Sequence, residues 1–175
     1  MAAIHERLRF DTAQGEVLDD DRRYVLLRAD VLMGLFARLS PEDRAKALGA
    51  FRDSAFEHGS HSVRAYARSL PDDGSALFRA VGEGAASLGW GAWRYESQDG
   101  VSRLRVRNSP FAKFAPASET PCCAPIAGIF RALCEQSWAC AVTVEELQCA
   151  AVRRDAGEQP QVCVFEARKT EQQED

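Results

Sequence analysis

The first half of the chain alternates short β-prone segments with stretches whose apolar residues recur at helical spacing. Residues 7–10 and 22–28 have alternating or β-prone patterns and predict short strands or a hairpin. Residues 29–39 carry apolar side chains at helical intervals and predict a helix. A longer helix should begin at Pro41, because Ser40 suits the N-cap and an acidic residue follows it three positions later.

The apolar stripe of this longer helix extends to about Tyr66, although Gly59 weakens its middle. Residues 75–88 predict a further helix, because their apolar positions again follow a helical period and Gly89 provides an end. We therefore expect residues 1–70 to be mainly helical.

From Trp90 onwards the apolar period becomes that of a strand. Residues 93–95 and 104–107 predict an antiparallel hairpin, because an Asp-Gly turn signal at residues 98–100 lies between them. Residues 108–121 are rich in proline and predict a loop. The sequence thus changes from helices to a sheet near its middle.

The last third of the chain predicts one helix and two strands. Residues 123–138 place cysteine, alanine and phenylalanine on one helical face, and strands are expected at about 141–153 and 161–168 around a turn at 154–160. The charged residues 169–175 form a tail. Because helices and strands come in blocks, the predicted fold class is α+β, with N-terminal helices packed on an antiparallel sheet and a C-terminal helix plus hairpin.

The length and charge of the chain narrow its function. With 175 residues, one domain over 1–175 is expected. The net charge of -4 provides no basic surface for direct nucleic-acid binding, and no apolar run approaches the roughly 20 residues of a membrane span. Charges near the N-terminus differ from a secretory signal, so a cytoplasmic location is expected. No nucleotide-binding or nucleophile motif is present, and we assign no catalytic residue.

The six cysteines are the main candidates for chemistry, since metal binding, catalysis or burial are their usual fates in a reducing compartment. Cys149 and Cys163 are equally distant from Ala156 in the predicted turn, so a symmetric hairpin would bring them close enough to share a zinc ion. A third thiol could come from Cys122 or Cys123, where a helix N-terminus favours the thiolate. The other cysteines suit packing.

A carboxylate could complete this zinc site. Glu145 and Glu146 both precede Cys149, and strand parity favours Glu145 because it lies an even four residues away. Glu146 would reach the same face only if a bulge or the end of the strand intervened. Both residues remain candidates on this argument.

Several short motifs resemble the 4-vinyl reductase domain family. They are Arg-Asn-Ser-Pro-Phe-Ala from residue 107, a helix-opening Cys followed by Ala-Gly-Ile-Phe, Glu-Leu-Gln-Cys from residue 146 and Cys-Val-Phe from residue 163. The family includes effector-sensing domains of aromatic-responsive bacterial activators, and its fold is related to that of nitric-oxide-signalling and Golgi-transport ligand-binding proteins. The match is centred on residues 90–168 and is only general over residues 1–70.

The resemblance implies a structural zinc ion. Carried over residue by residue, the ligands are Cys123, Glu146, Cys149 and Cys163. The resemblance therefore favours Glu146 where parity favours Glu145. The interval between the last two cysteines is longer than the compact turn of the family.

The resemblance also implies an apolar pocket between helices and sheet. The candidate pocket residues are the aromatic residues around the hairpin and the last helix and the histidine pair near Gly59, namely Trp90, Trp93, Tyr95, Phe111, Phe130, His58 and His61. The aromatic residues are equally consistent with core packing. The two histidines, three positions apart, are consistent with a helix surface, a pocket wall or a metal or haem site.

These features predict a zinc-stabilised binding domain for a small hydrophobic or aromatic molecule, such as a tetrapyrrole intermediate, acting as carrier or sensor. A zinc ion closed by four protein ligands does not activate water, so we expect binding rather than catalysis. A homodimer is expected through Phe36, Leu39, Leu48 and Phe51. The alternatives are a subunit of a vinyl reductase in bacteriochlorophyll synthesis and a protein-interaction adaptor of the vesicle-tethering type.

Overall fold

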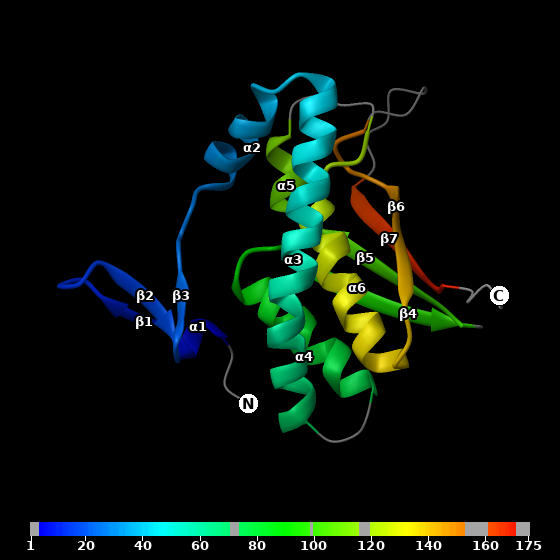
Figure 1. The fold of residues 1–175 in the computed structure, drawn as a ribbon, viewed down its shortest axis with the longest axis horizontal. Helices are drawn as coiled ribbons and strands as arrows, with labels where there is room; N and C mark the ends of the chain where they lie inside the picture. The colour runs from blue at the N-terminus through cyan, green and yellow to red at the C-terminus, as the bar shows by residue number, and fades with distance from the viewer. Residues whose placement is uncertain (1–3, 71–73, 99, 116–119, 153–160, 171–175) are drawn as a thin grey trace.

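A computed structural model describes residues 4–70, 74–98, 100–115, 120–152 and 161–170 (Figure 1). The described N-terminus starts with a short helix and a three-stranded antiparallel sheet, which forms an arm beside the body of the molecule in Figure 1. The elements are α1 (Ile4–Arg7), β1 (Arg9–Asp11), β2 (Glu16–Asp19) and β3 (Arg22–Tyr24). The predicted strands are confirmed, although the arm has a third strand that the pattern did not indicate.

Three helices follow the arm: α2 (Ala29–Ala37), α3 (Pro41–Ser69) and α4 (Gly74–Ser87). The predicted start of α3 is confirmed, because the Ser40 hydroxyl accepts a hydrogen bond from the Asp43 amide at 3.1 Å. The end of α4 is also as predicted. Gly89 has a φ of 78°, which glycine adopts without the cost that a Cβ would bring.

The main sheet has four antiparallel strands in the order β4-β5-β7-β6. They are β4 (Ala92–Gln98), β5 (Val101–Arg107), β6 (Val142–Gln148) and β7 (Val162–Lys169). Helix α6 (Ala124–Trp138) lies between this sheet and the long helix α3 (Figure 1). Its side chains Ile126, Phe130, Leu133 and Cys134 are fully buried, so α6 is the centre of the core. The α+β architecture predicted from the sequence is confirmed.

Two segments differ from the sequence prediction. The expected loop at residues 108–121 contains a short helix, α5 (Pro110–Phe114), because Ser109 caps it and proline occupies its first position. The expected strand at 141–153 ends at Gln148, because the chain turns at residues 149–152. The predicted turn at 154–160 lies outside the described residues.

Glycines allow α3 and α6 to approach each other closely. A Cβ at Gly128 would lie 2.2 Å from the Arg52 carbonyl oxygen and 2.9 Å from the Phe56 amide nitrogen. A Cβ at Gly59 would lie 2.1 Å from Cδ1 of Ile129. Gly59 lowers the intrinsic helix propensity of α3, but it provides the notch that receives a side chain of α6.

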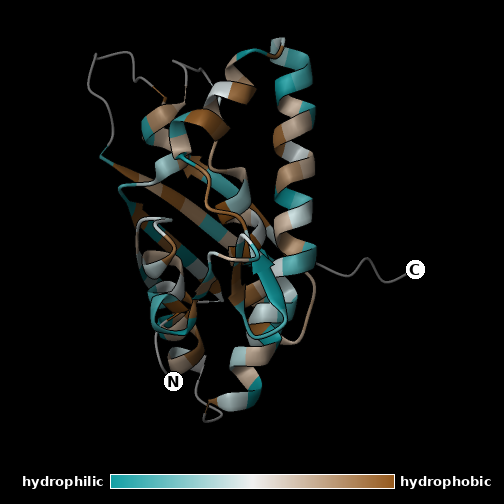
Figure 2. Cartoon of the chain, turned by 90° about the vertical axis from the view of Figure 1, so that its left-hand side faces the viewer, coloured by the Kyte–Doolittle hydropathy of each residue, from teal (hydrophilic) through white to brown (hydrophobic). Residues whose placement is uncertain are grey.

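The apolar residues expected at a dimer face instead pack within the chain. Phe36 and Leu48 are buried, and the rings of Phe36 and Phe51 stack with centroids 6.0 Å apart. Leu39 also packs against the core. Exposed apolar side chains gather on the connection between β3 and α2 and on the outer side of α2: Val25, Leu26, Leu27, Val31 and Leu35. Figure 2 shows this connection as a brown tube that rises from the arm to α2.

None of the helices in the described ranges is long and apolar enough to span a bilayer.

The close contact between the two helices makes a testable prediction. Gly128→Ala should lower the free energy of unfolding by about 2 kcal/mol or more, because the new methyl group meets backbone atoms that cannot rotate away. The matched control is Gly49→Ala in α3, where a Cβ has nothing within 4 Å. This control should raise stability by up to about 1 kcal/mol. Urea denaturation measures both variants, and equal stability of Gly128→Ala and the wild type would contradict the packing described.

Candidate metal centre and aromatic pocket

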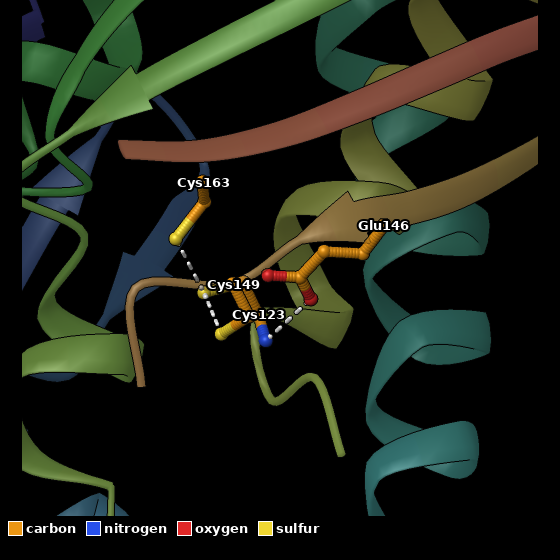
Figure 3. Close-up of side chains that lie close together, drawn as sticks. All are labelled: Cys123, Glu146, Cys149 and Cys163. Atoms are coloured by element: carbon orange, nitrogen blue, oxygen red, sulfur yellow. Dashed lines mark hydrogen bonds between the residues drawn. The ribbon is translucent and has the colours of Figure 1, made fainter. Parts of the chain in front are cut away.

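Three cysteines and one glutamate from separate elements converge at one point (Figure 3). Cys123 is the N-cap of α6, Glu146 lies in β6, Cys149 follows the end of β6, and Cys163 lies in β7. One ligand atom of each lies within 4.8 Å of all the others. The structure therefore brings together the four residues that the family resemblance selected.

The distances between the sulfur atoms fit a shared zinc ion. Cys123 Sγ lies 3.6 Å from Cys163 Sγ and 4.0 Å from Cys149 Sγ. Two thiolates bound to one tetrahedral zinc ion, each at about 2.3 Å, are roughly 3.8 Å apart. The measured distances lie on either side of that value.

A β-bulge explains why Glu146 and not Glu145 faces the cysteines. In the pairing of β6 with β7, Glu146 is opposite Phe165 and Gln148 is opposite Val164, so Leu147 is an extra residue. The extra residue reverses the parity and turns Cys149 to the face of Glu146. Glu145 is exposed. Strand parity alone therefore selects the wrong glutamate.

The two oxygens of the Glu146 carboxylate differ in their hydrogen bonding. Oε2 accepts a hydrogen bond from the Cys123 amide at 3.0 Å, while Oε1 is buried and has no hydrogen-bond partner among the described residues. Burial raises the pKa of Glu146 to about 9, with the nearby Cys149 adding to the effect. A buried carboxylate oxygen beside sulfur atoms costs free energy unless a cation binds it, so the donor set fits a divalent metal.

A nearby positive charge would stabilise the ionised cysteines in the same way as it would stabilise the Glu146 carboxylate. The pKa of Cys149 is lowered because neighbouring thiols donate hydrogen bonds to its sulfur, whereas the pKa values of Cys123 and Cys163 are raised by contact with the other sulfurs and by burial. Other donors already point at two sulfurs: Ser109 Oγ lies 3.1 Å from Cys123 Sγ, and the Ala150 amide lies 3.3 Å from Cys163 Sγ. Such donors orient and stabilise thiolate ligands of a metal.

The remaining cysteines lie outside this group of four. Cys122 is buried, with its sulfur 3.7 Å from Cys149 Sγ and 3.7 Å from the Phe111 carbonyl oxygen. Cys134 is fully buried in α6, and burial raises its pKa to about 12. Cys140 is partly buried.

A small pocket of about 120 Å³ lies between α1, β3, α3, α4 and α6. Trp90, Trp93, Val63 and Ile129 are among its apolar walls, and Tyr24, Tyr66 and Ser62 bring hydroxyl groups to it. The indole of Trp93 donates a hydrogen bond to the Trp90 carbonyl oxygen at 3.1 Å, which fixes the two tryptophans relative to each other. The pocket thus combines apolar walls with a few polar groups, as small-molecule sites do.

A second cleft of about 750 Å³ is open to solvent between α4, β4 and the end of α6. Phe78, Tyr95 and Trp138 line it, and Trp93 lies between it and the small pocket because it lines both. The hydroxyl of Tyr95 is buried and has no hydrogen-bond partner among the described residues.

The other candidate pocket residues lie elsewhere. Phe111 is buried against Trp90, with ring centroids 5.2 Å apart, and Phe130 is fully buried behind Tyr95. His58 and His61 are exposed on α3, with ring centroids 6.4 Å apart. The sequence analysis placed Ser109 in a family motif and Tyr66 in the apolar stripe of α3, but it gave no signal for their contacts or for Tyr24, because these depend on distant segments.

Two solved structures share the fold of this chain. The phenol-responsive sensory domain of the transcription activator PoxR, crystallised with phenol, has a TM-score of 0.74 and 17% identity over 97% of this chain and 88% of that chain. A vinyl-4-reductase family protein from Methanocaldococcus jannaschii has a TM-score of 0.51 and 15% identity over 82% of this chain and 91% of that one. No family model and no curated protein matches the sequence.

These likenesses define the fold. The chain is folded like a 4-vinyl-reductase-type sensor domain, as the sequence resemblance predicted. At these identities the likeness concerns the architecture, and the chemistry depends on the residues of this chain.

The metal centre makes a direct prediction. Protein purified without chelator should contain about one zinc ion per chain, and Cys149→Ser should contain almost none and unfold at a much lower temperature, because a structural metal contributes its binding free energy to folding. Cys140→Ser is the matched control, since Cys140 lies outside the group of four. Metal analysis by mass spectrometry and thermal unfolding measure the effect. Full zinc content in Cys149→Ser would rule out the proposed ligand set.

Proposed function

We propose that this chain is a zinc-stabilised binding domain for a small aromatic molecule and acts as a sensor or carrier, as one domain over residues 1–175. The small pocket beside Trp90 and Trp93 carries this proposal, because it offers apolar walls and hydroxyl groups at the same place. The phenol-responsive domain of the same fold supports it.

The size of the pocket favours one aromatic ring. Its volume of about 120 Å³ is close to that of an apolar protein cavity of about 150 Å³ that takes up benzene. A tetrapyrrole has four linked rings and exceeds this space. A single-ring ligand is therefore the better candidate than a tetrapyrrole intermediate, and this weakens the alternative of a vinyl reductase subunit.

The polar groups of the pocket favour a ligand with a hydroxyl group. Tyr24 has a hydroxyl with no hydrogen-bond partner among the described residues, and burial raises the pKa of Tyr24, which keeps this hydroxyl protonated and able to donate. The hydroxyls of Tyr66 and Ser62 already contact Arg7 and Arg22. When a ligand displaces water from the pocket, the Tyr24 hydroxyl loses its hydrogen bond to water. A phenolic oxygen of the ligand beside Tyr24 would replace that hydrogen bond.

The role proposed for zinc is structural. With four protein ligands the ion has no open position for water, so it binds no substrate and activates no nucleophile. It would tie the start of α6 to the end of β6 and to β7. Because Ile129 of α6 lines the small pocket, this tie would also hold one wall of the pocket in place.

We further propose that a second copy of this chain covers the apolar surface formed by Val25, Leu26, Leu27, Val31 and Leu35. Val25 is 83% exposed and Leu26 is 66% exposed, although apolar side chains this large are normally buried or paired. Leu27, Val31 and Leu35 are exposed as well, so the exposed apolar side chains form a continuous run from the connection onto α2.

The binding proposal predicts a difference between two conservative variants. Tyr24→Phe should weaken phenol binding about fivefold to tenfold, because it removes one hydrogen bond, and should leave toluene binding unchanged. Tyr95→Phe is the matched control, because Tyr95 lines the open cleft instead of the small pocket. Isothermal titration calorimetry measures both ligands. A loss of phenol binding in Tyr95→Phe alone would move the site to the open cleft, and no binding of either ligand by the wild type would contradict the proposal.

The dimer proposal predicts a change in mass. Wild-type protein at tens of micromolar should have the mass of two chains in light scattering, and Leu26→Glu should have the mass of one, because the charge cannot be buried unpaired in the interface. Phe114→Glu is the control, since Phe114 is exposed but lies in α5, outside this surface. A monomeric wild type would refute the dimer.

A further inference from the structure

The metal centre has one more cysteine than four ligands require. The sulfur of Cys122 lies 3.7 Å from the sulfur of Cys149, which is closer than the 4.0 Å between Cys123 and Cys149. Yet Cys122 is not among the four residues whose ligand atoms all lie within 4.8 Å of one another. It is a fourth thiol, in contact with one of the three thiol ligands of the centre.

The position of Cys122 keeps it a free thiol beside the metal ligands. Its sulfur also lies 3.7 Å from the Phe111 carbonyl oxygen of α5, so its S–H group can donate either to that oxygen or to Cys149. The next residue, Cys123, is the N-cap of α6 and points its sulfur at Cys149 and Cys163. Because the ion would be satisfied by the four ligands, nothing in the centre binds the sulfur of Cys122.

We propose that Cys122 and Cys149 form a reversible oxidation site, in which Cys122 is the resolving thiol for Cys149. This inference rests on the zinc centre proposed above. Both residues are buried, with 4% and 2% of their surface exposed, so the oxidant must be small, and hydrogen peroxide is the class we assign.

The chemistry takes place in two balanced steps. The thiolate of Cys149 attacks one oxygen of hydrogen peroxide, the O–O bond breaks, and the products are a sulfenic acid and hydroxide. The thiol of Cys122 then attacks the sulfenic sulfur, an S–S bond forms, and hydroxide leaves and takes the thiol proton as water. Two sulfurs together lose two electrons and the peroxide gains them. Cys149 is then no longer a thiolate ligand, so the affinity of the centre for zinc falls.

The geometry favours Cys122 over the other thiols as the partner of Cys149. A disulfide needs the two sulfurs at about 2.05 Å, so one sulfur must move by about 1.6 Å, and Cys122 is the thiol that the proposed ion would not hold. Cys123 and Cys163 are 3.6 Å apart, but a disulfide between them would remove two ligands that the metal itself holds. The non-ligand thiol is the one free to move.

The experiment compares zinc release from wild type, Cys122→Ser and the control Cys140→Ser after addition of hydrogen peroxide. A chromogenic zinc chelator follows the release, and peptide mass spectrometry maps the products. Wild type and Cys140→Ser should release zinc with formation of a Cys122–Cys149 disulfide, and dithiothreitol with added zinc should restore the zinc content. In Cys122→Ser, the amount of zinc restored by dithiothreitol and added zinc should be about tenfold lower. Without the adjacent thiol, the sulfenic acid of Cys149 proceeds to the irreversible sulfinic acid.

The possible failures are distinguishable. If Cys122→Ser recovers its zinc as fully as wild type, or if the mapped disulfide joins Cys123 to Cys163, the assignment of Cys122 is refuted while the zinc centre stands. If untreated wild type contains no zinc, the metal proposal fails. In that case the mapped disulfide still decides whether Cys122 and Cys149 are partners.

Discussion

The convergence of three buried sulfurs and one buried carboxylate is the constraint on which the rest of this structure depends. These groups come from the start of α6, from the bulged end of β6 and from β7. In an apolar interior they repel one another when ionised, and they bind one another only weakly when protonated. A divalent cation at their centre, as proposed above, would turn this conflict into a link between a helix and two strands. The Oε1 atom of Glu146, buried with no hydrogen-bond partner among the described residues, supports that proposal.

Helix α6 carries the effect of that link to the rest of the molecule. Its N-cap is a member of the metal centre, its buried side chains fill the space above the sheet, and Gly128 brings the backbone of α3 against it. Ile129, the next residue, occupies the notch at Gly59 and also lines the small pocket. The candidate metal centre and the pocket are therefore connected through one helix, so a bound ion would stabilise the proposed binding site without touching it.

Much of the fold follows from local patterns, whereas the sites depend on features that local patterns miss. The Ser40 cap, the Gly89 end and the hairpin of β4 and β5 were predictable, because each depends on residues close together in the chain. The choice of Glu146 was not, since one extra residue at Leu147 reverses strand parity and only the family resemblance pointed to it. Helix propensity alone also gives a wrong account of Gly59. This glycine weakens α3 locally, but its missing side chain allows the close contact with Ile129 of α6. The exposed surface near Leu26 differs from the expected dimer face because Phe36 and Phe51 pack on each other.

X-ray absorption at the zinc edge of the purified protein tests the central claim most directly, because it reports the atoms bound to the metal without mutation. We predict three sulfur neighbours at about 2.3 Å and one lighter neighbour at about 2.0 Å, the pattern of three thiolates and one carboxylate. Four sulfur neighbours would show that Cys122 replaces Glu146. A shell of oxygen and nitrogen atoms alone would contradict the account, because the metal would then lie outside the point where α6, β6 and β7 meet.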